Sequence, residues 1–401
     1  MKFTKEQLKN REFNLDVIIP QYNETEEVIK PLLSSIENQV GIDLSKINVI
    51  IVNDHSDTKL SQSFLDQFTK IKIQYLETPE NKGPGQARQF GIDASDADYI
   101  IFADADDLFY TCTIFSDILN VLINYSDKEF DIIYTKWLEE IISNNNVISV
   151  THNPDITWLH GKCFRRQYLL DRNIRFNENI KVHEDSYFNV VAQMNAGETA
   201  TLDALSYYWR FNPNSITRNA KYKYNYLVES AQDLVRSIND AADELIKRKT
   251  KGREEYIAKG ILFMYYLLQS SFWNDNLEND PDLQLRRRRF EISIKKTIIK
   301  YQDILNEIPR ADFIRCKNGE RAQCAANVGF ESEYETWEQF INRLNSIQPL
   351  YTKTCATCKH FKGNNEPCGK ENCIISLDND LEIYSIPTEY EEKEETIKET
   401  E

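Results

Sequence analysis

The 401-residue sequence has no long apolar run and no surplus of positive charge. No apolar run reaches the roughly 18 residues that a membrane-spanning helix needs, and the polar N-terminus lacks the apolar core of a signal peptide. We therefore expect a cytoplasmic protein without a transmembrane segment, whose thiols stay reduced. The net charge of −16 argues against broad binding to nucleic acid or anionic membranes, because both need a positive surface.

Up to residue 110, short apolar runs alternate with helix-length stretches such as Glu26–Gln39. The apolar runs are Leu15–Ile19, Ile47–Val52, Ile71–Leu76 and Tyr99–Phe102. Nearly continuous apolar strands alternating with helices predict an α/β fold, with a mostly parallel sheet and helices on both faces. Every strand is followed by polar or glycine-rich residues, and open α/β sheets bind ligands at the carboxyl ends of their strands. The sequence therefore predicts a binding site along that edge.

The later part of the chain predicts further elements and a division into four parts. Residues 111–218 contain candidate strands and a helix, and residues 220–310 have a helical period. The tail is rich in Glu, Lys and Thr, a composition that cannot bury a core. We expect a catalytic domain at 1–218, a helical C-terminal domain at 219–350, a cysteine-rich segment at 351–378 and a disordered acidic tail at 379–401.

An acidic cluster, Asp104–Asp107, follows the strand at Tyr99–Phe102. Asp104 and Asp106 are two residues apart, so their carboxylates can converge on one hard cation, Mg²⁺ or Mn²⁺, that would hold nucleotide phosphates. The alternative is a solvated acidic turn that caps the following helix.

Five motifs in sequence order resemble those of the family 2 glycosyltransferases, nucleotide-sugar enzymes of GT-A fold. They are Val17–Glu24, Ile51–Asp57, Asn81–Gly91, Asp104–Asp107 and His183–Phe188. In the second motif Asn53 replaces the first of the two acids that are usual in the family, and Asp54 keeps the second. The resemblance covers about residues 13–218. It implies an inverting, metal-dependent transfer of a sugar from a nucleotide-sugar to an acceptor hydroxyl.

The resemblance also implies a donor site for a UDP-sugar. The implied nucleotide-sugar residues are Pro20, Tyr22, Glu24, Asp54, Lys82, Gly83, Arg88, Asp104 and Arg210. Asp54 can accept a hydrogen bond from the uracil ring, and Tyr22 can lie along it. Lys82 and Arg88 can offset phosphate charge, although Arg88 can instead brace the acidic loop from its helix. Gly83 allows close backbone approach; the alternative is a helix start with turn glycines.

The catalytic and metal residues come from two of the motifs. Asp106 would bind a Mn²⁺ or Mg²⁺ ion, with His183 as a further ligand, and Asp104 would reach the metal or the ribose. The ion would neutralise the charge of the leaving diphosphate. Asp185 is the predicted general base, and Glu184 would bind the acceptor or orient the base. The alternative is that His183 only precedes a helix whose dipole favours the two acids.

The sequence does not identify the acceptor. Trp158 and Trp209 suit stacking on an acceptor sugar, although buried tryptophans would fit equally. A glycan, a polyol phosphate and other hydroxyl-bearing molecules stay open; nucleic acid is not expected, but a modified nucleobase stays among the open classes. The basic run Arg286–Arg289 is either a solvated helix face or a contact for an anionic acceptor.

Two rival functions fit parts of the pattern. A nucleotidyltransferase would also combine an α/β sheet with metal-binding carboxylates, but it has no use for Glu184 and Asp185. The second rival is a non-catalytic protein derived from a transferase. The intact acidic cluster argues against it.

Four of the eight cysteines are crowded near the C-terminus, at Cys355, Cys358, Cys368 and Cys373. Their spacing predicts a structural, tetrahedral Zn²⁺ site that staples a segment too short for its own core. His360 is a possible substitute ligand. Disulfides are the alternative and would need an oxidising compartment.

Overall fold

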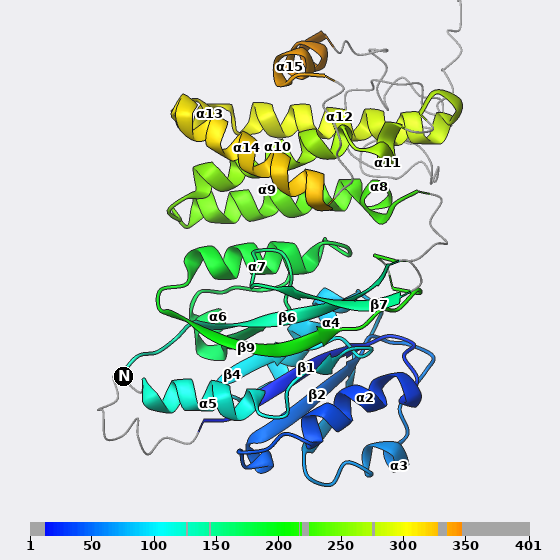
Figure 1. The fold of residues 1–401 in the computed structure, drawn as a ribbon, viewed down its shortest axis with the longest axis vertical. Helices are drawn as coiled ribbons and strands as arrows, with labels where there is room; N and C mark the ends of the chain where they lie inside the picture. Colours follow the sequence, from blue (N-terminus) through cyan, green and yellow to red (C-terminus); the bar gives the residue numbers. More distant parts are fainter. Residues whose placement is uncertain are drawn as a thin grey trace, which may run out of the picture. The chain divides into compact units, whose positions relative to one another are not determined.

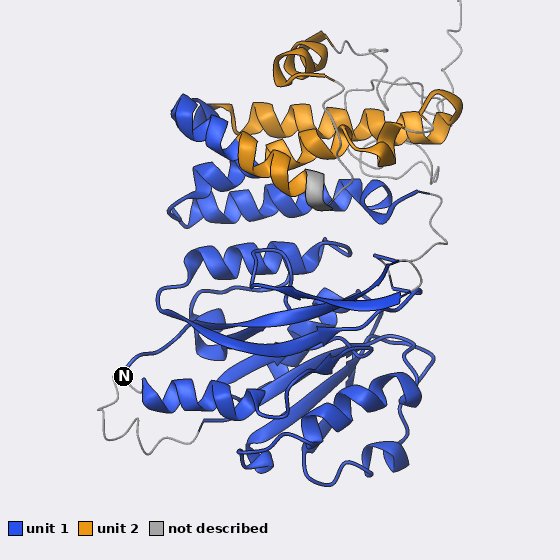
Figure 2. Cartoon of the chain, in the orientation of Figure 1, with its two compact units in different colours: residues 1–260, 303–316 blue, residues 261–302, 317–401 orange. Residues whose placement is uncertain are grey.

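The computed structural model describes residues 13–346, apart from positions 126, 144–145, 216, 219–223, 275–276 and 328–334. The cysteine cluster, its predicted zinc and the acidic tail therefore lie outside the described residues. The chain forms two compact units, residues 1–260 with 303–316 and residues 261–302 with 317–401 (Figure 2). The four-part division expected from the sequence stays a prediction.

One sheet of nine strands, counted over the described residues, forms the centre of the first unit. In spatial order its main path is β3 (Lys72–Glu77), β2 (Ile47–Asn53), β1 (Leu15–Gln21), β4 (Tyr99–Phe102), β8 (Lys162–Arg165), β6 (Ile132–Ser143), β9 (Thr199–Trp209) and β5 (Leu108–Phe109). The ninth strand, β7 (Asn146–His152), pairs with β6. The strands expected near the N-terminus are present within one residue or two of their expected bounds.

The sheet is mixed, which corrects the expectation of a mostly parallel sheet. Strands β3, β2, β1 and β4 are parallel neighbours, and β9 is parallel to β6. In contrast, β8 is antiparallel to β4 and β6, β7 is antiparallel to β6, and β5 is antiparallel to β9. The short connection from Ser143 to Asn146 explains the β6–β7 pairing, because so few residues can join only antiparallel strands.

Helices cover both faces of this sheet, as expected (Figure 1). One face carries α2 (Glu26–Glu37), α3 (Gln62–Leu65) and α5 (Ile114–Asn124), and the other carries α4 (Pro84–Ala94), α6 (Arg166–Asp171) and α7 (Glu184–Asn195). Strand side chains alternate between the two faces, so Val17 and Ile19 join the first core and Ile18 joins the second. A short 3₁₀ turn, Leu44–Lys46, precedes β2.

The rest of the described chain is helical, which confirms the prediction for residues 220–310. The helices are α8 (Tyr226–Glu229), α9 (Ala231–Lys247), α10 (Arg253–Leu268), α11 (Ser271–Asn274), α12 (Pro281–Lys300), α13 (Gln302–Glu307), α14 (Arg310–Asn327) and α15 (Trp337–Ser346), with a 3₁₀ turn at Leu277–Asn279. Among them, none combines the length and apolarity needed to cross a bilayer. Ile261–Leu268 is almost wholly buried, in line with its all-round apolar pattern.

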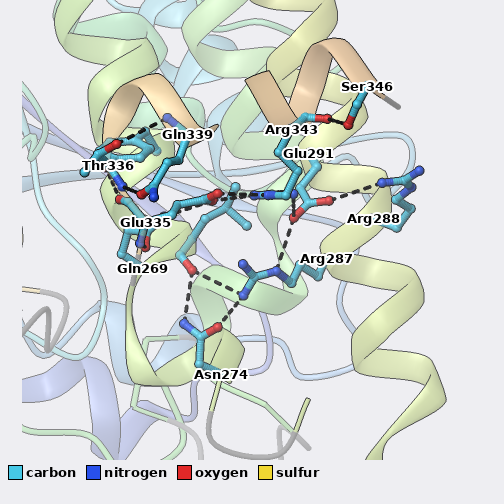
Figure 3. Close-up of polar contacts among 12 residues, drawn as sticks. Gln269, Asn274, Arg287, Arg288, Glu291, Glu335, Thr336, Gln339, Arg343 and Ser346 are labelled. Carbon is cyan, nitrogen blue, oxygen red and sulfur yellow. Dashed lines mark hydrogen bonds and ion pairs between the residues drawn. The ribbon is translucent and has the colours of Figure 1, made fainter. Parts of the chain in front are cut away.

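The basic run Arg286–Arg289 lies in α12 of the second unit, where two of its members serve a structural purpose. Arg287 and Arg288 pair with the buried carboxylate of Glu291 at 3.2 and 3.7 Å. Arg343 of α15 binds the same carboxylate at 2.7 Å (Figure 3). This cluster therefore ties α12 to α15, which gives Arg287 and Arg288 a structural role. The two readings of the whole run stay predictions.

Candidate functional site

The acidic loop, residues 103–107 between β4 and β5, is joined to α7 through a single buried arginine. Arg88 of α4 donates from Nη2 to Oδ1 of Asp104 at 2.5 Å and from Nη1 to Oε1 of Glu184 at 2.9 Å. The side chains of Arg88 and Glu184 are only 7% and 8% exposed. Charge-assisted hydrogen bonds of this kind are strong, so the geometry favours the bracing role for Arg88.

The two acids on Arg88 respond differently to their surroundings. Burial opposes ionisation of Asp104, but Arg88 and His160 hold its pKa below the ordinary range. For Glu184, burial and the neighbouring Asp185 raise the pKa to about 7, against the opposing effect of Arg88. A carboxyl group with this pKa changes its charge near neutral pH.

Gly85 explains how α7 comes so close to α4. A Cβ atom at this position would lie 2.6 Å from Cγ of Glu184 and 3.1 Å from its Cβ. Only glycine leaves room for that approach. The glycine motif therefore positions Glu184, in addition to starting the helix.

The two remaining acids of the loop have different environments. Asp106 is half-buried, and its Oδ2 accepts a hydrogen bond from the side-chain amide of Asn212 at 2.7 Å. Asp107 is fully buried; its Oδ1 accepts from the backbone N–H of Arg210 at 2.8 Å, and its Oδ2 accepts from the Tyr207 hydroxyl at 2.6 Å. Asp107 thus uses both oxygens inside the protein, whereas Asp106 keeps one for another partner.

The donor set around this loop fits a hard divalent cation. Ligand atoms of Asp104, Asp107 and His160 all lie within 4.8 Å of one another, a grouping that contains Asp107 and not the expected Asp106. Both oxygens of Asp107 already accept hydrogen bonds, so Asp104 and Asp106 stay the predicted metal ligands. Asp104 has one oxygen on Arg88 and Asp106 has one on Asn212, so each retains a second oxygen. Carboxylate oxygens are the ligands that Mg²⁺ and Mn²⁺ prefer.

His183, the third expected ligand, has a different partner. Its Nε2 lies 2.9 Å from the Ser230 hydroxyl. The residue is the N-cap of α7, with a left-handed φ of +69°. This geometry favours the reading in which His183 precedes the helix, and its role as a metal ligand stays a prediction.

The predicted base Asp185 lies in the first turn of α7. Its Oδ1 accepts a hydrogen bond from the backbone N–H of Ser186 at 2.7 Å. Burial raises the pKa of Asp185, with Arg88 opposing the effect and Asp104 adding to it. A raised pKa makes a carboxylate a better proton acceptor.

Asp54, expected to bind the uracil ring, organises the loop that enters α4. Its oxygens accept hydrogen bonds from the backbone N–H groups of Lys82 and Gly83 at 3.1 and 2.7 Å, and from the Thr78 hydroxyl at 3.1 Å. Gly83 has a φ of +88°, which glycine adopts without strain. The Lys82 ammonium group pairs with Glu80 at 3.0 Å. The nucleotide-binding roles of Asp54 and Lys82 stay predictions.

The residues after β1 approach the acidic loop. Glu24 accepts a hydrogen bond from the backbone N–H of Tyr22 at 2.5 Å. Burial raises the pKa of Glu24 to about 7, with further increases from Asp106 and Asp104. The Tyr22 side chain is 51% exposed, and Pro20 is partly exposed, so both can meet a ligand.

The two candidate acceptor residues lie together in an aromatic cluster. The ring centroids of Trp158 and Trp209 are 5.0 Å apart, and both side chains are partly exposed. The Arg218 guanidinium lies 4.1 Å from the Trp209 ring centroid. His160 and Tyr207 pack beside them. His160, Tyr207 and Asn212 were not predicted as site residues from the sequence. An aromatic residue in a strand, such as Tyr207, is also typical of a core.

A cavity of about 410 Å³ lies elsewhere in the first unit. Its lining includes Gln86, Phe176, Asn177 and Tyr187, and it contains none of the predicted site residues. The chemistry-bearing side chains therefore gather around the acidic loop and not in this cavity.

Residues 16–180 match the model of the family "Glycosyl transferase family 2". Residues 16–180 therefore carry the sequence pattern of a family 2 glycosyltransferase domain. Curated relatives of this chain include the uncharacterized glycosyltransferase EpsJ of Bacillus subtilis, 26% identical over 226 residues (51% of this chain and 62% of EpsJ). Another is the poly(ribitol-phosphate) beta-N-acetylglucosaminyltransferase TarS of Staphylococcus aureus, 27% identical over 207 residues (48% of this chain and 35% of TarS).

The chain also shares its fold with solved structures of S. aureus TarS. A TarS fragment in complex with UDP-GlcNAc gives a TM-score of 0.55 at 17% identity, covering 80% of this chain and 99% of that chain. A fragment in complex with UDP gives 0.53 at 18% identity, covering 80% and 93%. These similarities show that the chain shares the fold of TarS, in agreement with the GT-A fold expected from the sequence.

Proposed function

We propose that this glycosyltransferase is inverting and divalent-metal-dependent, and that it moves a sugar from a UDP-sugar to an acceptor hydroxyl. The Arg88 bridge carries the proposal. It holds Asp104, on the expected donor side, and Glu184, beside the expected base, on one buried guanidinium. A sugar transferase needs these two functions at a fixed separation, because the acceptor oxygen must attack the anomeric carbon in line.

On the donor side, Asp104 and Asp106 would hold the cation. A bound Mg²⁺ or Mn²⁺ ion would neutralise the charge that develops on the leaving diphosphate. Asn212 orients Asp106 through its hydrogen bond, and outer contacts of this kind tune ligand carboxylates. Tyr22 and Asp54 would bind the uridine, and Arg210 would face the diphosphate.

On the acceptor side, Asp185 would take the proton from the attacking hydroxyl. Burial raises the pKa of Asp185, which makes its carboxylate a better proton acceptor. Glu184 is buried against Arg88, so we assign it the orientation of the base in place of direct acceptor binding. Trp158 and Trp209 would offer an aromatic surface for the acceptor.

The relatives suggest the first ligands to test. TarS binds UDP-GlcNAc in one solved structure, so UDP-GlcNAc is our first donor candidate. TarS is named for poly(ribitol-phosphate), and the relative GgaB of Bacillus subtilis is named a minor teichoic acid biosynthesis protein (30% identical over 45% of this chain and 21% of GgaB). A polyol phosphate is therefore the acceptor class that we propose, in the cytoplasm.

A panel of nucleotide-sugars tests this function without knowledge of the acceptor. Transferases slowly pass the sugar to water, so release of free nucleotide identifies the donor. We expect release from one UDP-sugar, dependent on Mn²⁺ or Mg²⁺ and abolished by EDTA. Equal release with and without metal, or from no donor in the panel, would contradict the proposal.

A further inference from the structure

We propose that Tyr207 of β9 is a positioning residue that holds the acidic loop in the shape required for cation binding. The proposal rests on the proposed function of that loop. Asp104, Asp106 and Asp107 fall within four residues, and carboxylates this close repel one another, most strongly where they are shielded from water. The backbone of such a loop therefore needs partners outside the loop.

Tyr207 supplies two such contacts with one hydroxyl group. The hydroxyl oxygen accepts a hydrogen bond from the backbone N–H of Asp104 at 2.9 Å. The hydroxyl proton is donated to Oδ2 of Asp107 at 2.6 Å. The hydroxyl thus connects the first and last acids of the cluster. Tyr207 is 1% exposed, so water does not compete for these bonds.

Asp107 is the anchor of this arrangement. It is fully buried, and its other oxygen accepts from the backbone N–H of Arg210 at 2.8 Å. Removing a hydrogen-bond partner from a buried carboxyl group is costly, because the polar group is left unsatisfied. Asp107 therefore fixes the loop to β9, while Asp104 and Asp106 remain for the ligand. The spacing in the sequence favours Asp106 over Asp107 as a metal ligand, but it does not predict the anchoring contacts of Asp107.

Ring stacking fixes Tyr207 itself. Its ring lies on His160, with centroids 4.5 Å apart and planes at 14°. His160 is in turn nearly parallel to Trp158, at 5.9 Å and 4°. Three approximately parallel rings thus extend from a candidate acceptor residue to the acidic loop. The Tyr207 hydroxyl cannot swing away without breaking this stack.

The test is calorimetric titration of Mn²⁺ into the full-length chain in the presence of UDP. Tyr207→Phe removes the hydroxyl and keeps the ring. Loss of a contact that orients metal ligands typically weakens metal affinity roughly 10- to 100-fold, and we expect a loss in this range. The control is Tyr208→Phe, the next residue in β9, whose hydroxyl lies 3.2 Å from Ser149; it should bind Mn²⁺ like the parent.

A second variant keeps the test decisive if Tyr207→Phe fails to fold. Asp107→Asn preserves the side-chain shape but disturbs the same hydrogen bond, so it should weaken Mn²⁺ binding similarly. The double variant should lose less affinity than the sum of the two single losses, because both changes remove the hydrogen bond between Tyr207 and Asp107.

The outcomes distinguish the role of Tyr207 from the proposed function of the acidic loop. If the parent binds Mn²⁺ with UDP and folded Tyr207→Phe binds within about twofold of it, well below the loss expected of such contacts, this inference is wrong and the proposed function stands. Fully additive losses in the double variant would also overturn it. A parent without Mn²⁺-dependent binding would overturn the proposed function together with this inference.

Discussion

Arg88 donates a hydrogen bond to Glu184 across 2.9 Å, and both side chains are buried. The guanidinium belongs to α4 and the carboxylate to the first turn of α7. Because Arg88 also binds Asp104, one side chain sets the relation between the acidic loop and the predicted base. The approach depends on Gly85, which leaves the space that Glu184 occupies.

This bridge should contribute strongly to stability. Arg88→Met leaves the buried carboxyl group of Glu184 and the partly exposed carboxylate of Asp104 without their cation. Breaking a buried ion pair costs about 3–5 kcal/mol. Urea denaturation near neutral pH measures the change. The matched control is Arg175→Met, whose partner Asp93 lies 2.7 Å away with both side chains 46% exposed; exposed pairs contribute at most about 1 kcal/mol. Equal losses in the two variants would contradict the structural role of Arg88.

Glu24 should make stability depend on pH. Its pKa is about 7 in the folded chain, against 4.5 ordinarily, because of burial and of Asp106 and Asp104. Between pH 4.5 and 7 the folded state binds a proton at Glu24 that the unfolded state lacks. The contribution of protonated Glu24 to the free energy of unfolding is therefore fully present below about pH 4.5 and is lost as pH rises through 7. Glu24→Gln should therefore match the parent near pH 4.5 and exceed its melting temperature near pH 8, in EDTA.

A control of opposite sign is available next to Glu24. Hydrogen bonds from the Ser61 side chain and backbone lower the pKa of Glu26, so its charged form is the stabilising one. Glu26→Gln should be less stable than the parent near pH 8. If Glu24→Gln showed the same direction as Glu26→Gln, the environment assigned to Glu24 would be wrong.

Much of the fold could be predicted because its determinants are local. The run Ile47–Val52 is apolar throughout, as a strand buried on both faces must be, and the polar residues after each strand indicated the edge that bears the site. Strand order depends on distant partners, so nothing in the sequence placed β8 between β4 and β6.

The separate roles of neighbouring site residues were harder to predict from the sequence. Asp106 and Asp107 are adjacent acids in the sequence, and contacts from Tyr207 of β9 and from the residues that follow this strand give them different environments. His160 lies in a stretch that reads equally well as core. Arg88 was predicted with two alternative roles, and its contacts favour the bracing one.

The cysteine cluster gives a prediction that is independent of the catalytic site. Metal analysis of the purified chain should find about one zinc per chain, since four thiolates satisfy a structural tetrahedral site. Replacing Cys355 and Cys358 by serine should remove it, whereas Cys112→Ser, at an exposed free cysteine, should not. A mass spectrum of unreduced protein that shows the four C-terminal cysteines in disulfides would refute the zinc site.

The central claim is that Asp185 is the general base of a metal-dependent sugar transfer. The decisive measurement compares Asp185→Asn and Glu184→Gln with the parent, by release of nucleotide from the active donor and by calorimetric donor affinity. Loss of a general base costs roughly 10²- to 10⁴-fold in rate. We expect that loss for Asp185→Asn with donor affinity nearly unchanged, and a smaller loss for Glu184→Gln, whose amide oxygen can still accept from Arg88. Near-parental turnover by Asp185→Asn would contradict the account.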